Sequence, residues 1–171
     1  MKKLGVILFT FLFAGYSHAA LEANKIYFGG GLGMNSLSGI DFSDGLGFQI
    51  FAGYDLPVKM GQGTLSVEAG YMDTGDMTLG VTTVPTPAFP FFAVVPYEDN
   101  LTGVWANAVY SLPLQNKLSL LGRAGLDFGD DDGLMLGAGV GLQLDSKMEI
   151  RAEYVIRDTI DSLQVNLVIR Q

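Results

Sequence analysis

The chain has 171 residues, a formal net charge of -8, 23 glycines, one histidine and no cysteine. This length suits a single domain. The acidic balance argues against nucleic acid as a partner, because few cations are available to neutralise phosphates. The lack of cysteine excludes disulfides, thiolate nucleophiles and cysteine-ligated metal centres.

Residues 1–19 have the layout of a secretory signal peptide. A basic start precedes an uncharged, mostly apolar run over 4–16, and Ser-His-Ala then places small residues before a cut at Ala20. The run is too short to cross a hydrocarbon core of about 30 Å as a helix, although an uncleaved anchor is the alternative. Cleavage would remove the only histidine, His18, and leave an exported domain over 20–171.

The rest of the chain alternates between apolar and polar residues in segments of about ten residues, which predicts β-strands. The segments are 25–35, 45–56, 64–72, 101–112, 117–128, 134–144, 148–157 and 161–171. One face of each segment is apolar, whereas the other face holds most of the glycines, amides and charges. Apolar residues outside and polar residues inside are typical of a membrane barrel. We therefore predict an all-β fold, an eight-stranded antiparallel transmembrane up-and-down β-barrel. A soluble periplasmic barrel that binds a hydrophobic ligand is the alternative.

Two sets of connections alternate along the chain. The short set is 57–63, 113–116 and 145–147, and the other set is 36–44, 73–100, 129–133 and 158–160. If the first strand starts in the periplasm, the short set forms periplasmic turns and the other set faces outside the cell. Tyrosines near strand ends on the apolar face are expected to form interfacial girdles, because the ring favours one wet end. These are Tyr54, Tyr71, Tyr110 and Tyr154.

The sequence resembles the small outer-membrane β-barrel superfamily, best known from the eight-stranded outer membrane protein A and X types. The signal peptide and the ordered segments GFQIFAGYDL, LSVEAGY, WANAVYSLPL, LGAGVGLQL and MEIRAEY carry the resemblance over the whole mature chain. It implies the outer membrane of a Gram-negative cell, with outer-membrane lipid, lipopolysaccharide and the assembly machinery as partners. Such barrels usually end in an aromatic residue that this machinery reads, whereas this sequence ends in Gln171.

Charged residues on the polar face would lie inside the barrel, which eight strands leave just wide enough for side chains to fill. Buried charges are costly unless paired, so we expect a charge network in the lumen. The inward charged residues are Glu68, Arg123, Asp127, Glu149, Arg151, Glu153 and Arg157. Among them, we expect the network to link Glu68, Arg123, Glu149, Arg151 and Glu153. The network either plugs the barrel and fixes its register or gates a narrow pore. The inward glycines either make room for Tyr27, Phe51 and Trp105 or leave a partial cavity.

Segment 73–100 is the largest insertion and has Phe89, Phe91 and Phe92 among four prolines. Exposed apolar patches tend to mark contact sites, so these aromatic residues are candidate loop contacts for an extracellular ligand or receptor. Structural alternatives are that the segment folds over the barrel mouth, rests against the outer leaflet, or extends the strands that flank it.

The acidic cluster near residue 130 is expected to be a solvated turn rather than a divalent-cation site. Its members are Asp127, Asp130, Asp131 and Asp132. No metal, cofactor or enzymatic activity is expected, because the comparable barrel enzymes use a histidine base and the mature chain has none. Two functions remain. One is a surface barrel that presents 73–100 to partners, and the other is a narrow ion- or small-solute-conducting channel with a charged lumen gate.

Overall fold

The computed structural model describes residues 22–37, 44–85 and 92–171. The expected signal peptide and its cut before Ala20 lie outside the described residues, as do Phe89 and Phe91. A short 3-10 helix, η1 (Ala23–Lys25), precedes the first strand. The strands are β1 (Ile26–Leu37), β2 (Gly45–Met60), β3 (Gly63–Asp73), β4 (Met77–Pro85), β5 (Phe92–Asp99), β6 (Thr102–Pro113), β7 (Leu118–Gly129), β8 (Gly133–Gln143), β9 (Met148–Ile156) and β10 (Ile160–Arg170).

Eight of these strands close into an antiparallel barrel in the order β1-β10-β9-β8-β7-β6-β3-β2. Neighbours in the barrel are neighbours in the sequence, except that β3 pairs with β6 across the β4–β5 insertion and β1 pairs with β10. The predicted eight-stranded fold is thereby confirmed. In the described parts of the chain, no helix is both long and apolar enough to cross a membrane.

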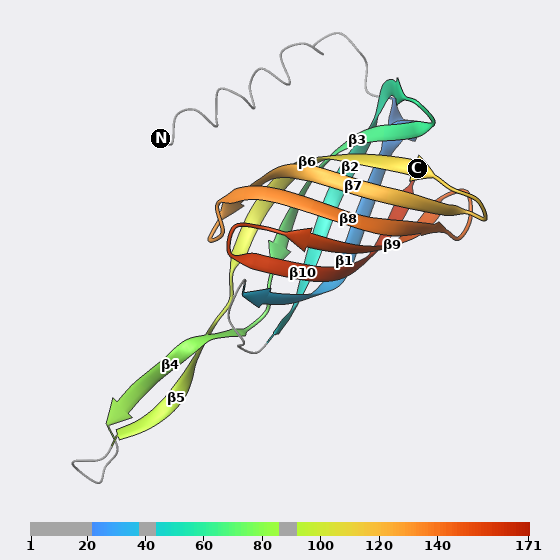
Figure 1. Ribbon diagram of the computed structural model, residues 1–171. Helices are drawn as coiled ribbons and strands as arrows, with labels where there is room; N and C mark the ends of the chain where they lie inside the picture. Colours follow the sequence, from blue (N-terminus) through green and yellow to red (C-terminus); the bar gives the residue numbers. More distant parts are fainter. Residues whose placement is uncertain (1–21, 38–43, 86–91) are drawn as a thin grey trace, which may run out of the picture.

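The two sets of connections lie at opposite ends of the barrel (Figure 1). The β2–β3, β6–β7 and β8–β9 turns lie at the end where β1 begins and β10 finishes, which we call the terminus end. The β4–β5 hairpin and the β1–β2, β7–β8 and β9–β10 connections lie at the other, which we call the hairpin end. Which end faces outside the cell stays a prediction.

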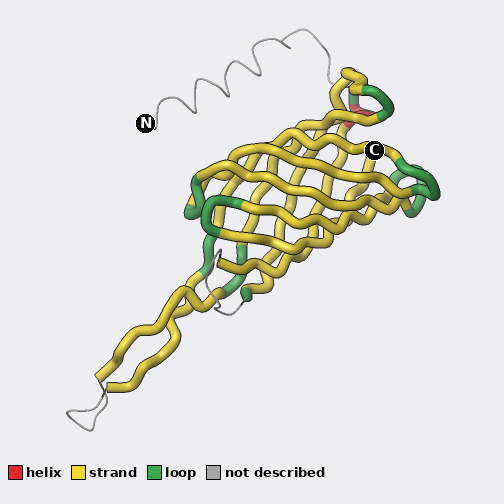
Figure 2. Tube along the Cα trace, in the orientation of Figure 1, coloured by secondary structure: helices red, strands yellow, loops and turns green. Residues whose placement is uncertain are grey.

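Two segments that were predicted to connect strands, 57–63 and 73–100, themselves contain β-strand. Residues 57–60 continue β2 past an irregular pairing between Asp55 and Lys59, and the turn itself is Gly61 and Gln62, with a φ of 65° at Gly61. The 73–100 insertion was expected as a loop, but β4 and β5 pair as a separate two-stranded sheet from Met77↔Asp99 to Pro85↔Phe92. Figure 2 shows this hairpin projecting away from the barrel, so its described part does not cover the mouth. Among the alternatives considered for segment 73–100, extension of the flanking strands is closest to what is observed.

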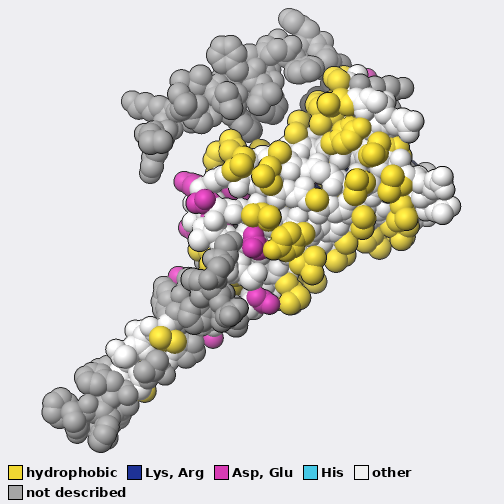
Figure 3. Space-filling view, in the orientation of Figure 1, with side chains coloured by type: hydrophobic (Ala, Val, Ile, Leu, Met, Phe, Trp, Pro, Cys, Tyr) yellow, Lys and Arg dark blue, Asp and Glu magenta, His cyan; other side chains and the backbone are white. Residues whose placement is uncertain are grey.

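Side chains alternate between the two faces of the barrel wall as a period of two requires. Apolar residues such as Leu32, Ile50 and Val165 stand on the outside and are more than half exposed. They form a broad hydrophobic surface over the barrel in Figure 3, whereas Asp and Glu gather toward the hairpin end. This outer face is the one that contacts lipid in a membrane barrel.

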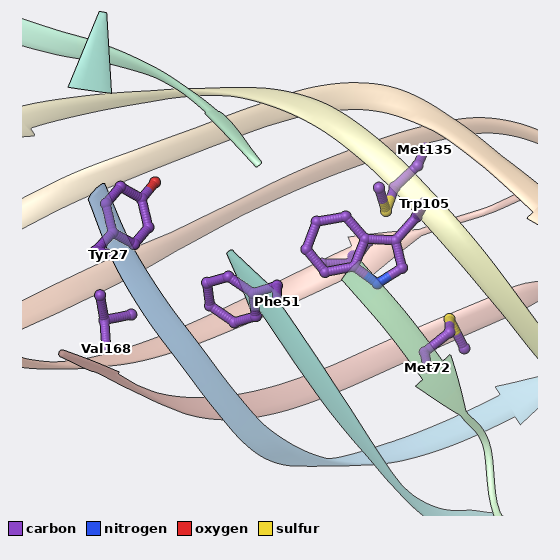
Figure 4. Packing of buried hydrophobic residues seen from close by; sticks show 7 residues of the cluster. Tyr27, Phe51, Met72, Trp105, Met135 and Val168 are labelled. Carbon is purple, nitrogen blue, oxygen red and sulfur yellow. The ribbon is translucent and has the colours of Figure 1, made fainter. Parts of the chain in front are cut away.

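An aromatic and aliphatic cluster fills part of the interior (Figure 4). Its residues are Tyr27, Phe51, Met72, Trp105, Met135, Val155 and Val168. The rings of Phe51 and Trp105 lie 5.7 Å apart. Glycines give these rings their space: a Cβ at Gly29 would lie 2.2 Å from Cζ of Phe51, and one at Gly53 would lie 2.1 Å from Cζ of Tyr27. The inward glycines therefore make room for large side chains.

Candidate functional site

Glu68 of β3 is the centre of the lumen charge network. Its side chain is fully buried and accepts a hydrogen bond of 2.7 Å from the Tyr27 hydroxyl and one of 2.7 Å from Nη1 of Arg151. Nη2 of Arg123 lies 3.6 Å from the other carboxylate oxygen. Four strands thus meet at one carboxylate: β3 supplies the anion, β1 supplies a hydroxyl, and β7 and β9 supply the cations.

Each of the two arginines also forms an ion pair with a second glutamate, Arg123 with Glu153 and Arg151 with Glu149. Nη2 of Arg123 is paired with Oε2 of Glu153, the same oxygen that accepts from Nε2 of Gln164 at 3.1 Å. Nη2 of Arg151 lies 3.2 Å from Glu149. All of these residues point inward because they share the polar parity of their strands, and a buried charge needs such partners to offset its lost hydration.

A second group lies at the terminus end. Arg170 of β10 pairs with Asp55 of β2 at 2.5 Å and lies 3.5 Å from Glu149, while Ser66 donates to Asp55 at 2.7 Å. Neither Arg170 nor Asp55 was among the predicted network residues. Both belong to the polar, inward-facing set of alternate residues in their segments, and that alternation could have identified them.

A third group lies at the hairpin end. Nε of Arg157 pairs with Asp127 at 2.7 Å, and its Nη1 donates to the hydroxyl of Ser162 at 2.7 Å. Ser162 in turn donates to Oδ1 of Asn35 at 2.6 Å. The structure therefore divides the seven predicted residues into two sets. Glu68, Arg123, Glu149, Arg151 and Glu153 form one connected cluster, and Asp127 and Arg157 form a separate pair.

The acidic turn engages its carboxylates in separate contacts. Asp131 accepts from the Thr159 backbone at 3.0 Å, Asp130 accepts from the Thr102 backbone at 2.9 Å, and Asp132 accepts from the Gly129 backbone at 2.8 Å. No cluster of three or more His, Cys, Asp or Glu with metal-binding geometry occurs among residues 22–37, 44–85 and 92–171. The carboxylates serve to tie the β7–β8 connection to its neighbours.

Arginine and aromatic side chains pack together in the lumen. The guanidinium carbon of Arg123 lies 5.7 Å from the Trp105 ring centroid, and those of Arg151 and Arg170 lie 5.4 and 4.8 Å from the Tyr27 ring centroid. Such contacts add to the ion pairs when they are desolvated. Two cavities near the hairpin end have volumes of about 10 Å³ each, which is about the space of one water molecule. The described interior is therefore lined by paired charges and packed rings.

The four predicted interfacial tyrosines lie on the outer face, two near each end of the barrel. Tyr54 and Tyr110 lie toward the terminus end, and Tyr71 and Tyr154 lie toward the hairpin end. The Tyr110 hydroxyl donates to the Met60 carbonyl at 2.8 Å. That these tyrosines lie at the two interfaces of a bilayer stays a prediction.

The β4–β5 hairpin exposes apolar side chains beyond the barrel. Val81 is 64% exposed and Val84 is 39% exposed. Phe92, the one predicted loop contact in a described strand, begins β5. The sequence has no Lys or Arg between Lys59 and Lys117, so the hairpin and its root carry only acidic charges. The projecting element therefore exposes two valines on β4 and has acidic residues at its base.

Comparison with known proteins agrees with this architecture. Residues 5–168 match the family model of the outer membrane protein beta-barrel domain. A chain from the de novo design of transmembrane beta-barrels is similar, with 12% identity, a TM-score of 0.57, and coverage of 88% of this chain and 98% of that one. The Yersinia pestis outer membrane protein Ail in a phospholipid bilayer nanodisc has 12% identity, a TM-score of 0.50, and coverage of 85% and 99%. At this identity, the two likenesses show the fold alone. No curated protein matches the sequence.

Proposed function

The chain belongs to the outer membrane protein beta-barrel domain family, and from that premise we propose that it is a non-enzymatic surface barrel that presents its β4–β5 hairpin to partners outside the cell. The projection beyond the barrel of a paired hairpin with exposed valines carries this proposal. Exposed apolar patches on a folded protein tend to mark contact sites. The barrel, held in the outer membrane by its apolar wall, serves as the anchor.

The charge at the hairpin end supports a partner of particular chemistry. Asp73 and Asp76 precede β4, Glu98 and Asp99 are the last two residues of β5, and no basic residue of the sequence lies between Asp73 and Asp99. An apolar partner surface with cationic residues around it would complement both features, because opposite charges steer association and exclude other partners. Lipopolysaccharide and the assembly machinery remain expected partners of the barrel wall.

The channel alternative receives less support from the interior. The arginines, carboxylates and rings of the lumen contact one another, and the two cavities near the hairpin end hold about one water molecule each. Conductance through this path would require the central ion pairs to separate. A planar-bilayer recording that shows discrete conductance steps, altered by Arg123→Ala, would favour the channel instead.

Cysteine labelling on intact cells tests the presentation of the hairpin. The sequence has no cysteine, so a single Val81→Cys in the hairpin can be labelled with a membrane-impermeant maleimide. The matched control is Lys147→Cys in the β8–β9 turn at the opposite end. We expect labelling of residue 81 on intact cells and labelling of residue 147 only after the outer membrane is permeabilised. Labelling in the reverse order would overturn the proposal.

A photocrosslinker at the same position tests the contact itself. We expect the residue-81 crosslinker to capture a surface component that the residue-147 crosslinker does not capture. Removal of residues 80–96, which include the crosslinker position, should abolish binding of the same component to protein without a crosslinker while the barrel stays folded, because β4 and β5 form a sheet separate from the barrel. Equal capture from both positions would mean that the hairpin is not the contact element.

A further inference from the structure

The hairpin projects from the barrel, but its root, residues 73–77 and 99–102, contains two buried side chains. Thr74 is fully buried and Met77 is 1% exposed. The two chains of the root are bonded to each other: the Thr74 amide donates to the Leu101 carbonyl at 2.9 Å, and the Leu101 amide donates to the Thr74 hydroxyl at 2.9 Å. The root is thus a packed junction between barrel and hairpin.

Two glycines of β2 allow the root to lie directly on the barrel backbone. A Cβ at Gly47 would lie 2.1 Å from the Asp73 carbonyl oxygen, and a Cβ at Gly45 would lie 2.5 Å from Cγ of Met77. Any side chain at either position would push the root outward. The next residue after the junction, Gly75, has a φ of 70°, a left-handed conformation that favours glycine. A bend is therefore built in at the point where the hairpin leaves the barrel.

A chain of buried hydrogen bonds links this root to the Asp127–Arg157 ion pair. Nδ2 of Asn35 donates to the Thr74 carbonyl at 3.0 Å, and its Oδ1 accepts from Ser162, which accepts from Arg157. The side chains of Asp127 and Arg157 are 3% and 1% exposed. These hydrogen bonds link β7, the β9–β10 connection, β10 and β1, and they end on the carbonyl of Thr74, the residue before Gly75.

We propose that this chain of contacts is a positioning device that fixes the direction of the β4–β5 hairpin, with Asn35 and Ser162 as its positioning residues. A two-stranded hairpin is marginally stable by itself, and a connection of a few residues that contains Gly75 would let it swing. The buried chain holds the root against the barrel, so the hairpin keeps one orientation. The inference deepens the proposed function, because it concerns how the contact element is held.

Distance measurement between two spin labels tests this device in the full chain in lipid nanodiscs. Val81→Cys and Leu134→Cys place one label on the hairpin and one on the outer wall near the hairpin end, where both side chains are about 60% exposed. Ser162→Ala should broaden the distance distribution at least twofold, and Ser162→Thr should restore it. The matched control is Ser66→Ala, which removes another buried serine that donates to a lumen residue, at the terminus end.

The outcomes separate the inference from a general loss of stability. We expect Ser162→Ala and Asn35→Ala to broaden the distribution while the gel mobility of unboiled protein stays that of the folded barrel. An unchanged width in both variants, or equal broadening in Ser66→Ala, would overturn the inference. If either variant fails to fold, the other still removes a link of the same chain. The proposed function fails separately, through the labelling and crosslinking results at residue 81.

Discussion

Replacement of Glu68 by alanine tests whether the lumen ion pairs stabilise the barrel. The carboxylate is fully buried, accepts from Tyr27 and Arg151 at 2.7 Å each, and lies 3.6 Å from Arg123. Its removal leaves one hydroxyl and part of two guanidinium groups without a partner. Breaking a buried pair from one side costs about 3–5 kcal/mol. We expect a loss near ~3 kcal/mol, the lower end of that range, because Arg151 keeps Glu149 and Arg123 keeps Glu153.

Urea unfolding in phospholipid vesicles, followed by tryptophan fluorescence, measures this loss. The sequence has a single tryptophan, and Trp105 is 2% exposed inside the lumen, so its emission reports on the opening of the barrel. Glu68→Gln should lower the free energy of unfolding less than Glu68→Ala does, because the amide oxygen still accepts a hydrogen bond. The control is Glu22→Ala, which removes an exposed pair with Lys25 and should cost about 0–1 kcal/mol. A loss for Glu68→Ala no larger than the control would refute the reasoning.

Two further pairs of substitutions test the packing of the lumen and the position of the barrel wall in the bilayer. Gly53→Ala should destabilise the barrel by about 1–3 kcal/mol, because its Cβ would lie 2.1 Å from a Tyr27 ring that hydrogen bonding and two arginines hold in place. Gly122→Ala, which has no atom within 4 Å of the added Cβ, is the control in the same urea titration. Val165→Arg in the middle of β10 should cost about 2–4 kcal/mol in lipid, and Leu134→Arg near the hairpin end about 0–1 kcal/mol. Equal costs at the two depths would argue against a bilayer centred on the barrel wall.

The strands were predictable because their signal is local. An alternation such as Leu163, Val165 and Leu167 against Gln164 and Asn166 marks both the strand and its inward face. The same parity assigned the charged residues to the lumen. Each strand of a membrane barrel must repeat this pattern, so eight independent segments pointed to one architecture.

The partners within the lumen were not predictable in the same way. Which arginine reaches which carboxylate depends on the register between strands distant in sequence, such as Glu68↔Asn107 and Gly31↔Asn166. The Arg170–Asp55 pair joins residues near opposite ends of the chain, and no local pattern encodes it. Strand in the β4–β5 hairpin was expected only as one alternative, an extension of the flanking strands, because prolines interrupt its alternation and its two strands pair only with each other.

The closing pair of strands constrains how the barrel can form. Every other neighbouring pair in the barrel is joined by a turn or by the β4–β5 insertion, but β1 and β10 pair from Tyr27↔Arg170 to Leu37↔Ile160 across nearly the whole described chain. Contacts of such long sequence separation pay the largest loop-closure entropy and form late. Until β10 arrives, both β1 and β9 have unpaired edges, which invite pairing with other chains. The pairing of β1 with β10 is therefore the folding step that competes with aggregation.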